Sequence, residues 1–413
     1  MILAAAFIIA STTSAPNAGG AFANLTLRNA EHSAAEHSPE VAAASAHVRE
    51  NAAVLTAARG NFGPALSANY AQSPQAGATG GTIEQRLSTI GGQITIGDLF
   101  NYSPAVQAAA ANLRSAQFDL IAAQRMENVR LIGLYYDALR AVATARTRSD
   151  ALAAAQEDRR AATVRFNVGD APRLDIVRAG VALARATAAN ETAIALQANA
   201  LEALAVETGM SASLLGEVES QTSDGGSLEL PRLEDAVQTA LSRRPEIASA
   251  QAAMAAEQAA VHSAERGILP VLTITSGYTR GIDSGINVAG PSATAQLTFP
   301  LSNASSQRAT AERARLEQAQ ARLAAIQRAV RIEVAAAVRT DDADGRALAA
   351  AEEGLRHAQE ELDAVTVGYR SGASSSLEVT AARQTYVEAV LDDFNAKYGQ
   401  AQARATLELL IGK

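Results

Sequence analysis

The chain has no cysteine and no tryptophan among its 413 residues, and only 4% of its residues are aromatic. Without cysteine, neither a disulfide bond nor a thiolate metal site can form. Large globular cores take much of their volume from aromatic side chains, so this shortage argues against a thick core. Alanine supplies much of the 48% hydrophobic content, and alanine is the best helix former. The composition therefore favours long, thin, closely packed helices.

Other absences narrow the class of function. The formal net charge of −8 argues against nucleic acid as a partner. The sequence has no Gly-rich phosphate loop, no Ser/His/Asp set with a nucleophile elbow, and no Cys/His dyad. The five histidines are scattered and lack the spacing of metal ligands. We therefore expect no enzymatic activity, no cofactor and no metal.

The N-terminal segment indicates export. Residues 1–10 form a short apolar run, and Ala21-Phe22-Ala23 has the small-residue pattern of a cleavage site. We expect 1–23 to be a secretory signal peptide; the alternative is a frayed apolar N-terminus. No later stretch holds the roughly 18 consecutive apolar residues of a membrane-spanning helix. If the exported protein lies in a membrane, it spans that membrane with strands.

The sequence contains an internal two-fold repeat. Residues 165–179 return as residues 368–382, an offset of 203, and residues 38–42 resemble residues 244–248, an offset of 206. The matched positions include Phe166 and Tyr369, Gly169 and Gly372, Asp175 and Glu378, and Gly209 and Gly412. The repeat predicts two tandem units, repeat 1 at 24–209 and repeat 2 at 232–413, joined by a linker at 210–231.

Proline spacing locates the long helices, because proline breaks helix interiors at a cost of about 3 kcal/mol. No proline lies between Pro104 and Pro172, between Pro172 and Pro231, or after Pro300. The predicted helices are 105–162, 173–209, 304–366 and 376–411. They form two antiparallel coiled hairpins, 104–209 with a tip at 166–174 and 304–411 with a tip at 369–377. Two shorter helices precede the strands in each half, at about 27–59 and 233–266.

Four segments alternate small polar and apolar residues with a period of two, which is typical of transmembrane β-strands. The predicted strands are about 62–73, 89–97, 269–279 and 293–301. The segments 74–88 and 280–292, rich in Gly, Ser and Pro, read as loops between them. Four strands cannot close a barrel, and an open edge in lipid leaves backbone groups unsatisfied, so several chains must share one barrel. The alternative is a soluble hairpin in each half with one buried face.

The turn sequences and the order of elements resemble one known family. Each half runs through short helices, a strand hairpin, a long helix, a tight turn and a final helix. The motifs are Asn24-Leu-Thr-Leu-Arg-Asn-Ala30 at the start, Phe166-Asn-Val-Gly169 followed by Asp175, Phe299-Pro-Leu301, and Tyr369-Arg-Ser-Gly372 followed by Glu378. From about residue 24 to the end, the chain resembles the TolC-like outer-membrane efflux protein family.

The resemblance implies a homotrimer in the cell outer membrane. Each chain would give four strands to one shared β-barrel, surrounded by outer-membrane lipid, and its helices to a long tube in the periplasm. The tube would meet a periplasmic adaptor protein served by an inner-membrane transporter. The implied function is a passive exit duct of a tripartite efflux pump or a type I secretion system, with the cargo left open. The alternative function is a soluble periplasmic coiled-coil scaffold.

The resemblance also assigns roles to the hairpin tips. The residues expected to contact the adaptor are Val168, Gly169, Asp170, Ser371, Gly372 and Ala373. The residues expected at the periplasmic entrance are Asp175, Tyr369 and Glu378. The carboxylates of Asp175 and Glu378 would form acidic rings that favour cations, and the Tyr369 phenol would pair with Asp175 between neighbouring hairpins. The alternatives are ordinary hairpin turns, and carboxylates placed at helix starts by the macrodipole. The chain departs from the family pattern at Ser374, where a basic residue is common, and at Ala381, where an acidic one is.

Overall fold

The structure is a computed structural model that describes residues 27–60, 65–76, 82–209, 232–267, 269–283, 286–299 and 304–412. The predicted signal peptide at 1–23 and the predicted linker at 210–231 lie outside the described residues.

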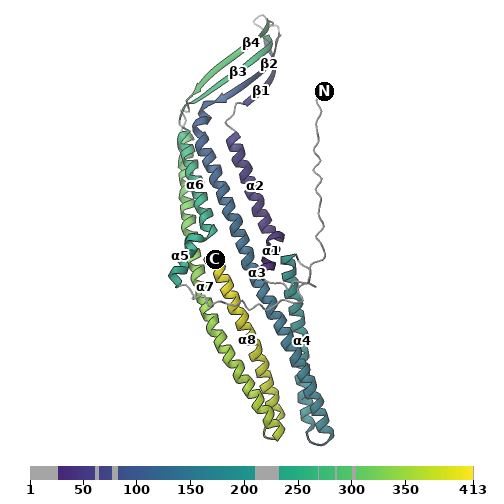
Figure 1. Ribbon diagram of the computed structural model, residues 1–413. Helices are drawn as coiled ribbons and strands as arrows, with labels where there is room; N and C mark the ends of the chain where they lie inside the picture. The colour runs from purple at the N-terminus through teal and green to yellow at the C-terminus, as the bar shows by residue number, and fades with distance from the viewer. Residues whose placement is uncertain are drawn as a thin grey trace.

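Two long helical hairpins dominate the molecule (Figure 1). The first consists of α3 (Ile96–Asn167) and α4 (Arg173–Thr208), and the second of α7 (Ala304–Ser371) and α8 (Ser376–Ile411). At about 1.5 Å per residue, the 72 residues of α3 extend roughly 108 Å. Both tips lie at one end of the molecule and the β-sheet lies at the other.

Two short helices precede the strands in each half, as predicted. They are α1 (Leu27–His37) and α2 (Pro39–Gly60) in repeat 1, and α5 (Leu233–Arg243) and α6 (Pro245–Arg266) in repeat 2. A proline opens the second helix of each pair, where its missing N–H leaves no hydrogen bond unmade. The helices α2 and α6 pack against α3, so the two repeats share α3 as a common support.

The four strands form a single antiparallel sheet in the order β1-β2-β3-β4. They are β1 (Ala65–Ala76), β2 (Thr82–Thr95), β3 (Val271–Asp283) and β4 (Ile286–Thr298). The β2–β3 ladder joins the two repeats. Within the chain, β1 and β4 are left as open edges. The predicted fold class, mainly helical with two tandem helix–strand-hairpin–helical-hairpin units, is confirmed.

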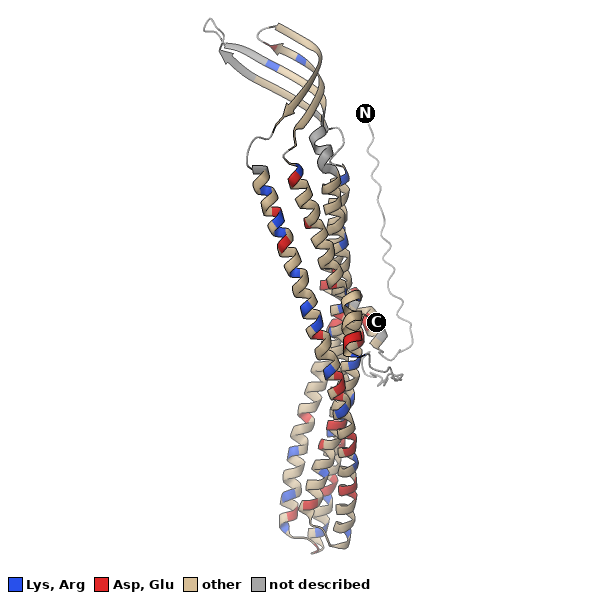
Figure 2. Ribbon diagram, turned by 90° about the vertical axis from the view of Figure 1, so that its left-hand side faces the viewer, with Lys and Arg blue, Asp and Glu red and all other residues tan. Residues whose placement is uncertain are grey.

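One face of the sheet is mainly apolar, with Arg86 and Arg280 also on it, and the other face carries mainly small polar residues. Ladder register places Leu272 opposite Leu297 and Ile90 opposite Tyr278 on the first face. The second face carries Thr89 opposite Thr279, whose hydroxyls lie 3.1 Å apart. Large apolar side chains of the first face are solvent-exposed in the single chain: Leu66, Tyr70, Ile90, Ile274, Tyr278, Ile282 and Leu297. Figure 2 shows many charged residues along the helices and few on the described part of the sheet.

The strands differ from their predicted bounds, because much of the predicted loops 74–88 and 280–292 is strand. Small residues rich in Gly, Ser and Thr suit loops, but they also fit the polar face of a sheet whose backbone groups are paired along the ladder. Two prolines in these segments, Pro74 and Pro291, lie in β1 and β4. Both are edge strands, where a missing N–H need not break the ladder.

The helix α3 begins before its predicted start. It includes Pro104, which the sequence interpretation placed at the boundary, and its first residue Ile96 lies within the strand predicted at 89–97. A proline inside a helix removes one backbone hydrogen bond, and the helix continues past it here. Similarly, α7 continues to Ser371, five residues beyond its predicted end.

Two apolar clusters repeat the internal symmetry. One contains Leu131 and Leu204, and the other contains Val334 and Leu407, at positions that match with an offset of 203. Both lie where the hairpins meet the short helices, so the middle of the molecule carries the core. Of the helices in the described ranges, none combines the length and the apolarity that crossing a membrane requires.

Candidate functional site: the two hairpin tips

The first tip is a compact helix C-cap. Gly169 has φ +86°, in the left-handed region that glycine adopts at no steric cost. The Gly169 N–H donates to the Phe166 carbonyl over 3.0 Å, and the Asp170 N–H donates to the Arg165 carbonyl over 2.8 Å. This pair of bonds is a Schellman motif, which satisfies the last carbonyls of α3. Pro172 is the N-cap residue of α4, and its carbonyl accepts a 3.0 Å hydrogen bond from the Asp175 N–H.

The second tip repeats this geometry. Gly372 has φ +81°, and its N–H donates to the Tyr369 carbonyl over 3.3 Å, while the Ala373 N–H donates to the Gly368 carbonyl over 2.7 Å. Ser374 packs so close to Gly368 that a methyl group added at Gly368 would clash with the serine hydroxyl. Ser374 occupies the position where the family commonly has a basic residue, and in this chain it is part of the turn.

The tips expose apolar side chains at their ends. Phe166, Val168 and Leu174 are exposed on the first tip, and Leu377 on the second. The predicted adaptor-contact residues Val168, Gly169, Asp170, Ser371, Gly372 and Ala373 are all solvent-exposed. Exposed apolar residues around a rigid turn form a surface that a partner can cover.

Asp175 connects the two tips. Its Oδ1 accepts a hydrogen bond of 2.8 Å from the hydroxyl of Ser376, in the first turn of α8. Arg178, one turn along α4, lies 3.9 Å from the same oxygen. The Asp175 side chain is mostly covered, with 15% of its surface exposed. Asp175 therefore lies between the two hairpins of one chain.

Glu378 has a local structural role. Its Oε2 accepts a 2.6 Å hydrogen bond from the Ser375 N–H, and its own N–H donates to the Ser375 hydroxyl over 3.3 Å. This is a capping box, which satisfies two free N–H groups at the start of α8. The helix-start interpretation of Glu378 therefore holds within the single chain. A further role at an entrance remains a prediction.

Tyr369 pairs with an arginine within the chain. The guanidinium carbon of Arg165 lies 4.5 Å from the Tyr369 ring centroid, a cation–π contact between the two hairpins. The sequence interpretation pairs the Tyr369 phenol with Asp175 of a neighbouring hairpin. Within this chain Asp175 instead accepts a hydrogen bond from Ser376.

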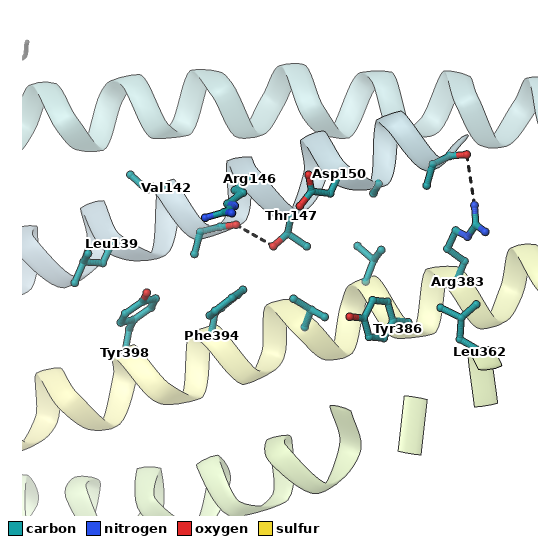
Figure 3. A pocket seen from close by; sticks show the side chains of 15 residues that line it. Leu139, Val142, Arg146, Thr147, Asp150, Leu362, Arg383, Tyr386, Phe394 and Tyr398 are labelled. Atoms are coloured by element: carbon teal, nitrogen blue, oxygen red, sulfur yellow. Dashed lines mark hydrogen bonds between the residues drawn. The ribbon is translucent and has the colours of Figure 1, made fainter. Parts of the chain in front are cut away.

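A groove follows the boundary between the hairpins (Figure 3). It has a volume of about 730 Å³ and lies between α3 and α8. Aromatic side chains of α8, Tyr386, Phe394 and Tyr398, line one wall. At its tip-side end, Arg383 of α8 forms an ion pair with Asp158 of α3. This ion pair and the Asp175–Ser376 hydrogen bond both connect the first hairpin to the second.

Sequence reasoning missed the buried charged residues in the middle of the molecule. Glu127, Arg244 and Asp341 are each at least nine-tenths buried. Burial raises the pKa of the Asp341 carboxyl, although the acidic run that contains it reads as a solvated face. For the burial of Arg244, the repeat alignment gives one sequence signal, because it matches Arg244 with Ser38 at the break between the two short helices. Nothing in the local sequence indicates burial of Glu127 or Asp341.

Comparisons with known proteins agree with this architecture. Residues 236–413 match the sequence model of the family described as outer membrane efflux protein. Protein CyaE of Bordetella pertussis is 29% identical over an alignment of 314 positions that covers 71% of this chain. The matched region spans 64% of the length of that relative.

Two solved structures share the fold. The Campylobacter jejuni CmeC outer membrane channel superimposes with a TM-score of 0.82 at 18% identity, covering 95% of this chain and 86% of its own. The outer membrane protein VceC of Vibrio cholerae gives a TM-score of 0.78 at 18% identity, covering 94% of this chain and 96% of its own. At these identities the likeness shows the fold.

Proposed function

We propose that this chain, as a member of the outer membrane efflux protein family, is the exit duct of a tripartite efflux pump or a type I secretion system. In this role it is a passive conduit that crosses the outer membrane with its sheet and extends through the periplasm with its helical hairpins. The transporter in the inner membrane supplies the energy.

The two-faced sheet carries this proposal. Its apolar face leaves Leu66, Tyr70 and Leu297 more than half exposed in the single chain. Exposed apolar surface of this kind marks a contact with lipid or with another protein. Small polar residues on the opposite face suit a water-filled interior, and alternation of the two kinds is the pattern of a membrane barrel.

The open edges of the sheet support an oligomer. In lipid, the free N–H and C=O groups of β1 and β4 would lack partners, at several kcal/mol for each group. Pairing β1 of one chain with β4 of the next removes both edges. A closed ring of chains, a homotrimer in the family arrangement, satisfies every strand.

The tips support docking to a periplasmic adaptor. They lie at the end of the molecule opposite the sheet, and each presents a rigid glycine turn. In the ring of chains, the tips surround the periplasmic mouth. Val168, Gly169 and Asp170 of the first tip, with Ser371, Gly372 and Ala373 of the second, contact the adaptor there.

The entrance itself is assigned to Asp175, Tyr369 and Glu378. All three lie within a few residues of a tip glycine, so a ring of chains brings several copies of each to one level. Carboxylates arranged in a ring favour cations over anions. The bond from Ser376 to Asp175 keeps the two hairpins of one chain close at this level.

Single-cysteine labelling tests the proposal, because the chain has no cysteine of its own. Leu297→Cys and Gln296→Cys place a fluorophore at adjacent β4 positions on opposite faces of the sheet. In lipid vesicles, we expect the probe at 297 to be quenched by nitroxide-labelled lipid and the probe at 296 by aqueous iodide. Equal quenching of both probes by iodide alone would identify a protein that stays outside the bilayer, such as a soluble scaffold.

A further inference from the structure

Each repeat has a junction where its last helix ends beside the break between its two short helices. In repeat 2, Arg244 lies at this break and is only 4% exposed. Its Nε donates to the Leu410 carbonyl of α8 over 3.1 Å, and its Nη1 lies 2.5 Å from Glu333 Oε2 of α7. One arginine, which stays charged at every physiological pH, therefore joins three parts of repeat 2.

Repeat 1 has different residues at the matched positions. Ser38 stands in place of Arg244, Arg130 in place of Glu333, and Glu207 in place of Leu410. The Arg130 Nη2 lies 2.9 Å from Glu207 Oε2, but more than half of the arginine side chain is exposed. Among the described residues at these matched positions, repeat 1 therefore has no buried cation.

Instead, carboxylates gather there with too few donors. Glu127 of α3 is 4% exposed, and its Oε2 accepts a 3.1 Å hydrogen bond from the Ser38 hydroxyl. The same hydroxyl lies 3.2 Å from Glu40 Oε2, and it has only one hydrogen to donate. The other oxygen of Glu127, Oε1, is buried without a hydrogen-bond partner. A buried acceptor without a donor is costly, so a donor to Glu127 Oε1 would stabilise this junction.

We propose that the Glu207 carboxyl of α4 keeps its proton and donates a hydrogen bond through it to the buried Glu127 of α3. This hydrogen bond would join α4 to α3 at the position where Arg244 joins α8 to α7 in repeat 2. Repeat 1 then has a pH-dependent link at the position where repeat 2 has a permanent one. Loss of the proton places two carboxylates against each other at the end of α4, and the link is released.

The charges around Glu207 support proton binding. The pKa of Glu207 is raised to about 7, first by the hydrogen bond with Glu127, then by burial and by the charge of Glu127. Arg130 acts in the opposite direction, and Glu40 of α2 raises the pKa further. Two like charges in one site cannot both ionise easily, which is the reason that one carboxyl keeps its proton.

The charged groups that act on Glu207 come from α3 and α2, and the other elements in contact with α4 carry titratable groups of their own. From α1, His37 lies against Gly209, where an added methyl group would meet its ring. From α8, Arg404 and Glu408 act on Asp341 of α7. Within the described ranges, no group of three or more His, Cys, Asp or Glu side chains is arranged to hold a metal ion.

Infrared spectroscopy of the purified, detergent-solubilised protein tests this inference. The absorption of protonated carboxyl groups is followed as the pH rises from about 5 to about 9. We expect one carboxyl per chain to lose its proton near pH 7 in the wild type. This transition should be absent in Glu207→Gln. It should be retained in Glu202→Gln, which changes an exposed glutamate of the same helix.

Glu127→Gln provides an independent variant if Glu207→Gln does not fold. Its amide donates a hydrogen bond to the Glu207 carboxylate, so Glu207 ionises at lower pH and the neutral transition should also disappear. A wild-type titration curve without a transition near neutral pH would overturn the inference. So would a transition that persists unchanged in both glutamine variants.

Discussion

The Ser376 hydroxyl donates a 2.8 Å hydrogen bond to Asp175 Oδ1, and this bond joins the first turns of α8 and α4. The two residues belong to different repeats, 201 positions apart in the sequence. Their contact is therefore a product of the doubled architecture, in which two hairpins end at the same level. It places the two tips of one chain side by side at the expected periplasmic end.

Removing this bond should loosen the tips without unfolding the helices. We expect Ser376→Ala to raise the open probability of the channel several-fold, because Asp175 then loses its donor on the other hairpin. Ser371→Ala is the matched control, since the Ser371 hydroxyl donates only to the Gly368 carbonyl of its own turn. Single-channel recording measures both variants. Equal behaviour of the two would show that the contact between hairpins does not restrain opening.

The left-handed glycines should be sensitive to a single methyl group. At Gly169 an added Cβ meets nothing within 4 Å, so Gly169→Ala isolates the backbone cost, about 1–2 kcal/mol of unfolding free energy. Gly180 also has open space, but it lies inside α4, where alanine is preferred. Gly180→Ala should therefore stabilise the protein by about 0.5–1 kcal/mol. Thermal denaturation followed by circular dichroism should shift in opposite directions for the two variants.

The stability of the protein should depend on Glu333, the carboxylate that pairs with the buried Arg244 of repeat 2. Glu333→Ala leaves Arg244 buried without its ionic partner, and we expect the free energy of unfolding to fall by about 2 kcal/mol. Glu353→Ala removes a carboxylate from an ion pair with Arg356 in which both side chains are exposed. That change should cost less than about 0.5 kcal/mol. Similar losses of unfolding free energy in the two variants would mean that the burial of Arg244 does not strengthen its ion pair with Glu333.

The carboxyl link of repeat 1 predicts the sign of a pH effect on stability. The folded-state pKa of Glu207 is raised to about 7, so the folded chain holds a proton that the unfolded chain releases at lower pH. The contribution of Glu207 is fully present below its unfolded pKa and is lost as the pH rises through about 7. We therefore expect the melting temperature to fall between about pH 5 and about pH 8 in the wild type. The fall should be smaller in Glu207→Gln, and an equal fall in both would contradict the link.

The long helices and their turns were predictable because each depends on local chemistry. Proline-free stretches rich in alanine form α4 and α8, and the matched glycines at 169 and 372 have the positive φ that a helix reversal needs. The capping box is also readable in the sequence, as Ser375 followed three residues later by Glu378. The sequence interpretation places Glu378 at an entrance or, through the macrodipole, at a helix start, and the capping box adds a hydrogen-bonded role at that helix start.

The strand ends were harder to predict, because the residues that make good loops also make the polar face of this sheet. Pro74 and Pro291 read as breaks, and only the strand order shows that both lie on edges. Burial of Glu127 depends on contact between α3 and the α1–α2 break, which lie 89 positions apart. No local pattern carries that information. The comparison of Ser38 with Arg244 indicates only that the two junctions differ.

The central claim, that copies of this chain form a water-filled duct, is tested most directly by single-channel recording in planar lipid bilayers. The purified, detergent-extracted protein should form stable pores that prefer cations, as judged from the reversal potential in a salt gradient. Glu378→Gln can keep the capping box and removes the charge, so it should form the same pores with a weaker cation preference. A protein that stays soluble without detergent and forms no pores would contradict the claim.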